Sequence, residues 1–288
     1  MSLTVLALVV AAAVAHASWN LVAKPAVGGA AFVWLCAMAG TLLYLPALLC
    51  ALAVDPGSLG RTAVALMAGS GALHAVYFVL LQRAYASGEL SVVYPLARGT
   101  GPLLSTTAAI VFLGERPSLP ALAGAGLIVA AVFSLIRRSE DVGSSTPGRG
   151  TVFAVLTGAA IAAYTLWDKH AVGAAALSPI VYYWGTNLAN AGVLTPVALR
   201  HPQELRQAWT VSRGRALGVG LLSPLAYVLV LYALARAPVS YVAPARESSI
   251  VVGTLLGVFV LHEQDTARRV AAAAAILVGV VVLSLAGQ

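Results

Sequence analysis

SVVYPLARGTGPLLSTTAAIVFLGE, residues 91–115, decides the fold because a version of it returns as SYVAPARESSIVVGTLLGVFVLHE at residues 240–263. The two copies share four residue types in the same order: Ser91, Pro95, Arg98 and Glu115 in the first, and Ser240, Pro244, Arg246 and Glu263 in the second. The spacing from arginine to glutamate is 17 residues in both copies. A guanidinium inside an apolar run is costly unless it faces a bundle interior, a partner or water, so both arginines are candidate functional residues. The alternative is a structural ion pair, which Arg246 could make with its neighbour Glu247.

The composition is that of a membrane protein. With 60% hydrophobic and 9% charged residues in a chain of 288, there is too little polar surface to cover a water-soluble globule. Apolar runs of about 20 residues recur along the whole chain, each long enough to cross about 30 Å of hydrocarbon as a helix. The short alternating strands that a membrane barrel needs are absent from the sequence. The net charge of +7 comes from basic residues scattered over loops and helix ends, so it favours membrane orientation over nucleic-acid binding.

The two cysteines predict no disulfide with each other. Cys36 and Cys50 fall on one apolar run, about 21 Å apart along a helix, which is too far for a bond. The sequence shows neither a metal-ligand framework nor a nucleotide-binding loop, so we expect no metal, no cofactor and no ATP-driven pump.

The apolar runs predict an all-α membrane protein with ten transmembrane helices. Their expected ranges are 3–23, 30–53, 62–83, 90–113, 118–136, 151–172, 179–199, 214–236, 239–261 and 268–286. Residues 137–150 form a polar linker rich in serine, glycine and charge.

The chain divides into a first five-helix repeat at residues 1–136 and a second at residues 151–288. A constant offset of 148 residues aligns Trp19 with Trp167 and Arg98 with Arg246. Each repeat has an odd number of helices, so the second copy enters the membrane from the opposite side. Inverted repeats of this kind place a substrate site near the membrane midplane and alternate its access.

The first apolar run ends in a motif that imitates a signal-peptide cleavage site, but it lacks a basic amino-terminal region and has a counterpart inside the chain. We therefore expect the first helix to be part of the fold.

Polar and aromatic residues of several predicted spans lie at similar depths in the membrane. We therefore expect a midplane cavity lined by the first, third, fourth, sixth, eighth and ninth spans. The candidate substrate-binding residues are His16, Trp19, Asn20, His74, Tyr77, Tyr94 and Arg98 from the first repeat, and Tyr164, Trp167, Asp168, Tyr227, Tyr241, Arg246 and Glu247 from the second. Those spaced three or four residues apart share a helix face.

Several of these candidate residues have a structural explanation as well as a functional one. The two arginines match a carboxylate or other planar oxyanion, whereas Glu247 is either a proton-coupling group or the permanent partner of Arg246. Asp168 adjoins Lys169 and a histidine, which is typical of a wetted interface as well as of a site. The histidines can relay protons or sit neutral and hydrogen-bonded, and the tryptophans can stack on a ring or belong to the interfacial aromatic belt.

A second group of residues is expected to shape the helices. Pro95 and Pro244 each remove a backbone donor and predict kinks beside the arginines. Glu115 and Glu263 close their spans and are expected to hydrogen-bond exposed amides at the start of the next helix. Gly253 and Gly257 form a small-residue face that we interpret as helix packing.

These residues resemble the drug/metabolite transporter superfamily, specifically its EamA-type members with two five-helix repeats. The resemblance is carried by Tyr94-Pro95-Leu96-Ala97-Arg98 with Leu113-Gly114-Glu115-Arg116, by Ala243-Pro244-Ala245-Arg246-Glu247 with Leu261-His262-Glu263-Gln264, and by Trp19-Asn20. The second copy has His262 and Gln264 where the first has Gly114 and Arg116, so a basic residue after the glutamate is not shared. The resemblance implies secondary transport of a small organic solute, often as export.

The function expected is therefore alternating-access transport, by proton or gradient coupling, of a zwitterionic or anionic metabolite such as an amino acid. The expected partners are the solute and membrane lipid, in a bacterial inner membrane, with a monomer preferred over a dimer. A lipid or lipid-carrier flippase shares the fold and stays an alternative. An intramembrane hydrolase using Ser70 and His74 is a further one, although no oxyanion motif flanks the serine. The Lys and Arg count places both termini outside the cytoplasm, whereas the resemblance implies termini inside, and the sequence leaves orientation open.

Overall fold

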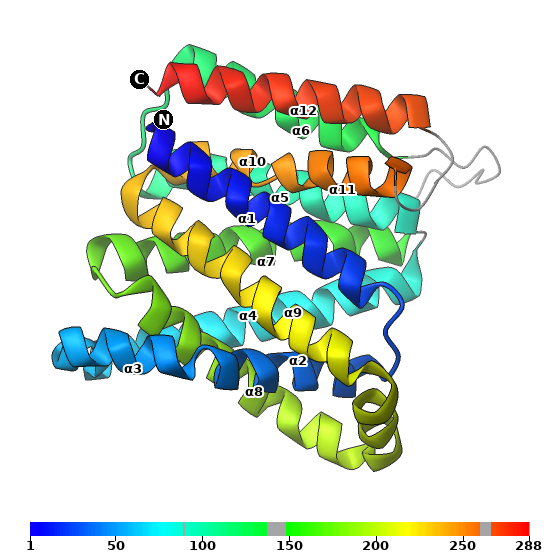
Figure 1. Ribbon diagram of the computed structural model, residues 1–288. Coiled ribbons are helices and arrows are strands. Elements are labelled where there is room, and N and C mark those ends of the chain that lie inside the picture. Colours follow the sequence, from blue (N-terminus) through cyan, green and yellow to red (C-terminus); the bar gives the residue numbers. More distant parts are fainter. Residues whose placement is uncertain (89, 137–147, 260–265, 288) are drawn as a thin grey trace.

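The computed structural model describes residues 1–88, 90–136, 148–259 and 266–287, and the regular elements in these ranges are all helices (Figure 1). Their bounds are α1 Leu3–Ala23, α2 Gly29–Leu43, α3 Leu45–Val54, the 3₁₀ turn η1 Pro56–Leu59, α4 Arg61–Ser87, α5 Leu90–Phe112, α6 Leu119–Ser134, α7 Arg149–Lys169, the π turn η2 His170–Ala174, α8 Pro179–Arg200, α9 Pro202–Arg236, α10 Val239–Ala245, α11 Ser248–Phe259 and α12 Thr266–Ala286. Most of the predicted linker, at residues 137–147, lies outside the described ranges.

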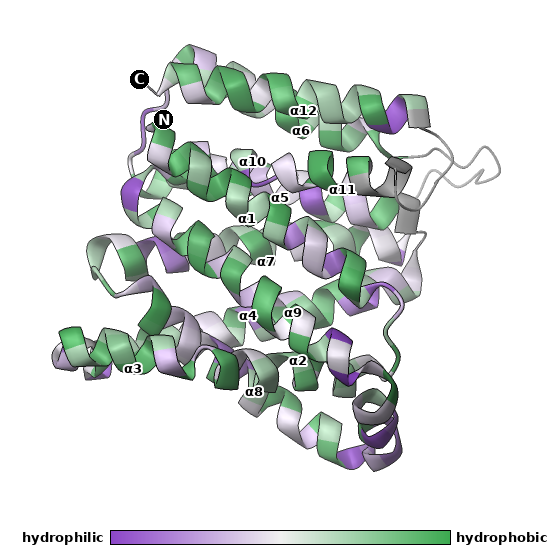
Figure 2. Ribbon diagram, viewed as in Figure 1, coloured by the Kyte–Doolittle hydropathy of each residue, from purple (hydrophilic) through white to green (hydrophobic). Residues whose placement is uncertain are grey.

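Several of these helices are built to cross a membrane. In the described ranges, five are long and apolar enough by themselves: α1, α4, α7 with η2, α9, and α12 from Ala267. The pair α2 and α3, which meet at a bend of 42°, gives a sixth if it is one span, and α6 is apolar but shorter. Figure 2 shows hydrophobic residues along most of the helical surface and hydrophilic residues collected toward helix ends. An all-helical membrane protein is confirmed, and the ten-span inverted arrangement stays a prediction.

Three predicted spans differ from the helices that form. The span expected at 30–53 is divided into α2 and α3 by the 42° bend. The span expected at 214–236 is the end of α9, which already begins at Pro202. Pro202 at the first helical position and Glu204 in the first turn both favour a start there, and Ala208 is fully buried against Gly28. The span expected at 239–261 is instead broken into α10 and α11.

The helices lie in stacked layers, with α6 and α12 at one edge and α2, α3 and α8 at the other (Figure 1). The contacts come in pairs related by exchanging the two halves of the chain: α1 packs on α9 as α7 packs on α4, and α2 packs on α9 as α8 packs on α4. The two chain ends meet at one end of the bundle, where the amino group of Met1 donates a hydrogen bond to the Ser284 carbonyl at 2.8 Å.

Small residues allow the closest helix crossing. A Cβ atom added to Gly158 of α7 would lie 1.9 Å from Oγ1 of Thr100 on α5, so only glycine fits there. Ser105 and Ala109, further along α5, are fully buried. These small residues of α5 therefore serve helix packing.

The glycine stripe expected on α11 behaves differently. Gly253 is exposed, and a Cβ atom built on it would meet nothing within 4 Å. The predicted packing role of Gly253 is therefore wrong in this structure. Gly257 lies in the part of α11 whose side-chain surroundings are not described.

Candidate functional site

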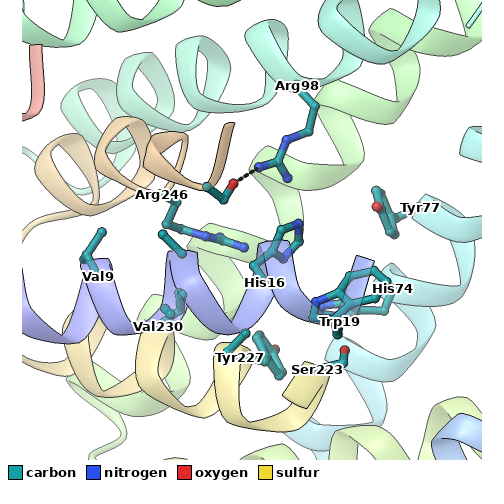
Figure 3. Close-up of a pocket in the computed structure, with 14 residues that line it drawn as sticks. Val9, His16, Trp19, His74, Tyr77, Arg98, Ser223, Tyr227, Val230 and Arg246 are labelled. Atoms are coloured by element: carbon teal, nitrogen blue, oxygen red, sulfur yellow. Dashed lines mark hydrogen bonds between the residues drawn. The ribbon is translucent and has the colours of Figure 1, made fainter. Parts of the chain in front are cut away.

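A cavity of about 190 Å³ lies in the middle of the bundle, between α1, α4, α5, α9 and the break after α10 (Figure 3). Its lining consists of Val9, Ala12, Ala13, His16, Trp19, His74, Tyr77, Arg98, Ser223, Ala226, Tyr227, Val230, Arg246 and Ser249. One wall is aliphatic and the others are polar or aromatic, which suits a solute with an apolar body and a charged group.

Arg98, on α5, faces the cavity as one half of a buried ion pair. Its Nε lies 3.0 Å from Oε2 of Glu247, and its Nη2 donates to Oγ of Ser249 at 3.2 Å. The side chains of Arg98 and Glu247 are 18% and 6% exposed, so water screens this pair weakly. The ion pair joins the two halves of the chain.

Of the two alternatives that the sequence left open for Glu247, a permanent ion pair with its neighbour Arg246 does not form, because Glu247 pairs with Arg98. Consecutive residues on a helical turn point in directions about 100° apart, so adjacent charges do not face each other. Glu247 turns to α5, whereas the Arg246 side chain projects into the cavity toward His16 (Figure 3). In the described ranges, Arg246 makes neither an ion pair nor a side-chain hydrogen bond.

The helix break explains the position of Arg246. Pro244 lies in α10, and the helix ends directly after it, with the amides of Glu247, Ser249 and Ile250 bonding three residues back instead of four. The corresponding Pro95 lies inside α5, which stays helical through it and through Pro102. The chain thus leaves the α-helical conformation just after Pro244, whereas it stays α-helical through Pro95.

Aromatic rings surround the free guanidinium and the histidines. His16 and Trp19 of α1 meet edge to face at 5.1 Å between ring centroids. His74 lies between two tyrosines, stacked on Tyr164 at 4.2 Å and edge-on to Tyr227 at 5.3 Å. These ring contacts hold His16, Trp19, His74 and Tyr227 in place, and all four residues also line the cavity.

Asp168 lies behind this wall and is 1% exposed, so the expected wetted interface is wrong. Its Oδ1 accepts hydrogen bonds from Ser70 at 2.7 Å and Tyr182 at 2.8 Å, and its Oδ2 accepts one from Tyr227 at 2.6 Å. The adjacent Lys169 turns the other way and donates to the carbonyl oxygens of Leu234 and Ala237.

The sequence prediction and the geometry overlap in part. His16, Trp19, His74, Tyr77, Arg98, Tyr227 and Arg246 line the cavity, whereas Asn20, Tyr94, Tyr164, Trp167, Asp168, Tyr241 and Glu247 do not. Among the second group, Asn20 donates to the His16 carbonyl, Trp167 donates to the Leu66 carbonyl, and Tyr94 is 39% exposed. The sixth predicted span, α7, contributes no lining residue and supports the wall from behind, through Tyr164 and Asp168.

Glu115 acts on a different helix from the one expected. Its two carboxylate oxygens accept the amides of Val239 at 2.7 Å and Ser240 at 2.8 Å, so it caps α10 instead of α6. The next helix, α6, is capped by Ser118, whose hydroxyl oxygen accepts the amide of Ala121. Glu263, which has the equivalent position in the second copy, lies outside the described residues.

Reasoning from sequence missed Ser223, Ser249 and Tyr182. Ser223 and Tyr182 lie outside the repeated stretch, and Ser249 lies within its second copy but is not one of the residues that the two copies share. Tyr182 follows the loop after α7 at a distance of 14 residues from Asp168, and only the folded bundle shows that they meet.

The pair Ser70 and His74 has no nucleophile geometry. The Ser70 hydroxyl donates to Asp168, and Nδ1 of His74 lies 2.9 Å from the Ser70 carbonyl oxygen, which can only accept. His74 is therefore positioned as a donor at this nitrogen, not as a base toward Oγ, which lies 3.3 Å away. Among the described residues, no group of three or more potential metal ligands converges.

These features define a helical membrane protein with a central cavity whose mainly apolar lining carries two arginines. Residues 148–285 match the model of the EamA-like transporter family. The match covers the second half of the chain, which is therefore similar to this family, part of the drug/metabolite transporter superfamily that the repeated motifs resemble.

A solved structure described as "Crystal structure of protein" has the same fold, with a TM-score of 0.73 over 99% of this chain and 98% of the other, at 21% identity. At that identity the likeness concerns the fold alone. A search of curated proteins found no match.

Proposed function

We propose that this chain is a secondary transporter that carries a small organic anion across a bacterial inner membrane. The observation that carries the proposal is Arg246, a cavity-lining guanidinium that makes no ion pair in the described part of the chain. Glu247 is near enough to interact with Arg246 electrostatically but is paired with Arg98, so a carboxylate or phosphate brought in by a solute would supply the direct partner that the Arg246 guanidinium does not have among the described residues.

The lining favours an anion over a zwitterion such as an amino acid. The cavity-lining residues include two arginines and no carboxylate, because the nearby Glu247 is engaged by Arg98. A solute ammonium would find only hydroxyl and ring acceptors. The aromatic rings of Trp19, Tyr77 and Tyr227 suit a planar or apolar solute body.

Alternating access through two inverted five-helix repeats is part of the proposal. It is supported by the contact pairs that exchange the two halves of the bundle, and by the ion pair between Arg98 and Glu247 that joins them. Export and a gradient-driven mechanism follow the resemblance to the family and stay predictions.

A solute screen tests the proposal. Purified protein is heated with carboxylates and organic phosphates, and in parallel with their neutral amides or esters, since a ligand of the folded state raises its apparent stability. We expect only anions to raise the melting temperature. We expect Arg246→Gln to abolish the rise and the exposed Arg206→Gln, on the surface of α9, to retain it.

A measurement of anion flux then distinguishes solute transport from the alternative function, lipid flipping. The best anion of the screen should enter proteoliposomes faster than in protein-free vesicles, and Arg246→Gln should remove the difference. Scrambling of a labelled phospholipid with no anion flux would overturn the proposal in favour of a flippase.

A further inference from the structure

Asp168 is a buried carboxyl group at a junction of four helices. It lies on α7, and its three partners come from three other helices: Ser70 from α4, Tyr182 from α8 and Tyr227 from α9. In the described ranges it makes no ion pair, and the neighbouring Lys169 bonds elsewhere. Intramembrane carboxyl groups without a fixed counter-ion are strong candidates for functional proton binding.

We propose that Asp168 is a proton-binding site that communicates with the central cavity through Tyr227. Its role in coupling proton movement to solute movement rests on the proposed transport function. The site itself stands on the four-helix junction described above.

The partners explain why a proton can bind there without rearranging the helices. A hydroxyl group both donates and accepts hydrogen bonds, so it can serve a carboxylate as donor and a carboxylic acid as acceptor after its hydrogen rotates. All three partners of Asp168 are hydroxyls. Glu247 differs, because a proton on its carboxylate would leave the buried Arg98 without its charge partner.

Tyr227 provides the connection. Its hydroxyl lies 2.6 Å from Oδ2 of Asp168, and its side chain lines the cavity, whereas Asp168 is closed off from it. In the proposed step, the Tyr227 oxygen accepts a proton from a hydronium ion in the cavity while its own proton passes to Oδ2. The net change is the uptake of one proton by the Asp168 carboxylate, with one water molecule left in the cavity.

The titratable groups at this junction are His74 on α4, Lys169 on α7, which turns away, Tyr182 and Tyr183 on α8, and Tyr227 on α9. Arg98 and Arg246 are the charged residues of the cavity that Tyr227 lines. His74 is a competing proton acceptor. A carboxyl-specific measurement separates the two.

Infrared difference spectroscopy of the reconstituted protein, recorded between a high and a low pH, supplies that measurement, with the proton itself as the probe. We expect the wild type to gain a carbonyl-stretch band of a buried carboxylic acid that shifts in heavy water. Asp168→Asn should abolish the band, and Tyr227→Phe should move its frequency because one hydrogen-bond partner is lost. The double variant Arg98→Met with Glu247→Leu, which removes the other buried carboxylate together with its partner, should retain the band.

The proposal is overturned if the wild type gives no such band, if the band survives Asp168→Asn, or if Tyr227→Phe leaves its frequency unchanged. The Tyr227→Phe variant keeps the aromatic ring and tests the site even if Asp168→Asn does not fold. No solute is needed, so failure of this experiment and failure of the solute screen are separate results.

Discussion

Arg98 and Arg246 hold equivalent places in the two copies of one motif, yet their surroundings differ. Arg98 projects from an unbroken helix, α5, and reaches a carboxylate of the other half of the chain. Arg246 follows a helix that ends at that point and projects unpaired into the cavity. The same residue type at the same place in the motif thus has different surroundings, because the chain is helical through Arg98 and the helix ends just before Arg246.

The largest effect is expected from breaking the ion pair of Arg98. Glu247→Gln leaves a buried guanidinium without its counter-ion and should destabilise the protein by about 3–5 kcal/mol. Thermal unfolding in detergent measures the loss. The double variant Arg98→Met with Glu247→Leu removes both charges and should recover most of the stability. If Glu247→Gln were as stable as the wild type, the ion pair between Arg98 and Glu247 would not be what stabilises the contact between the two halves of the chain.

The free arginine should behave in the opposite way. Arg246→Gln removes a group that contacts no described carboxylate, so stability should change little, while anion affinity falls by about 1.5–3 kcal/mol, roughly 10- to 100-fold. Titration of the best anion of the screen by calorimetry measures this. Arg246→Lys keeps the charge but loses the planar fork of donors, and an intermediate affinity is expected. If Arg246→Gln strongly destabilised the protein and left the anion affinity unchanged, Arg246 would have a structural role like that of Arg98.

Glu115 fixes the amino end of α10, the helix that Arg246 directly follows. Glu115→Ala leaves the amides of Val239 and Ser240 uncapped and should cost about 1–2 kcal/mol of stability. Glu115→Gln retains one acceptor oxygen and should cost less. Parallel unfolding curves of the two variants give the order, and equal effects would argue against capping.

The smallest effect is expected at Gly253 of α11. Since a Cβ atom there meets nothing within 4 Å, Gly253→Ala should leave stability unchanged or raise it by up to about 1 kcal/mol. Gly158→Ala, at the tight crossing of α5 and α7, is the matched control and should destabilise clearly. A large loss at Gly253 would show that it packs in a way this structure does not display.

The fold was predictable to the level of helices, and the site only in part. Long apolar runs are local properties, so α1, α4, α8 and α12 begin and end within a few residues of their expected bounds. The start of α9 was missed because Pro202 and Ala208 belong to a polar segment whose apolar face becomes visible only against Gly28. Asp168 was misplaced because its neighbours in sequence are charged, whereas its neighbours in space are hydroxyls from three other helices.

The sequence alone determined that this is a helical membrane protein, that a motif with an intramembrane arginine occurs twice, and that the chain resembles EamA-type transporters. These are properties of composition and spacing along one chain. Only the tertiary structure decided which charges meet. Pairing depends on distances between side chains 149 residues apart, such as Arg98 and Glu247, and on helix directions that turn adjacent residues such as Arg246 and Glu247 away from each other.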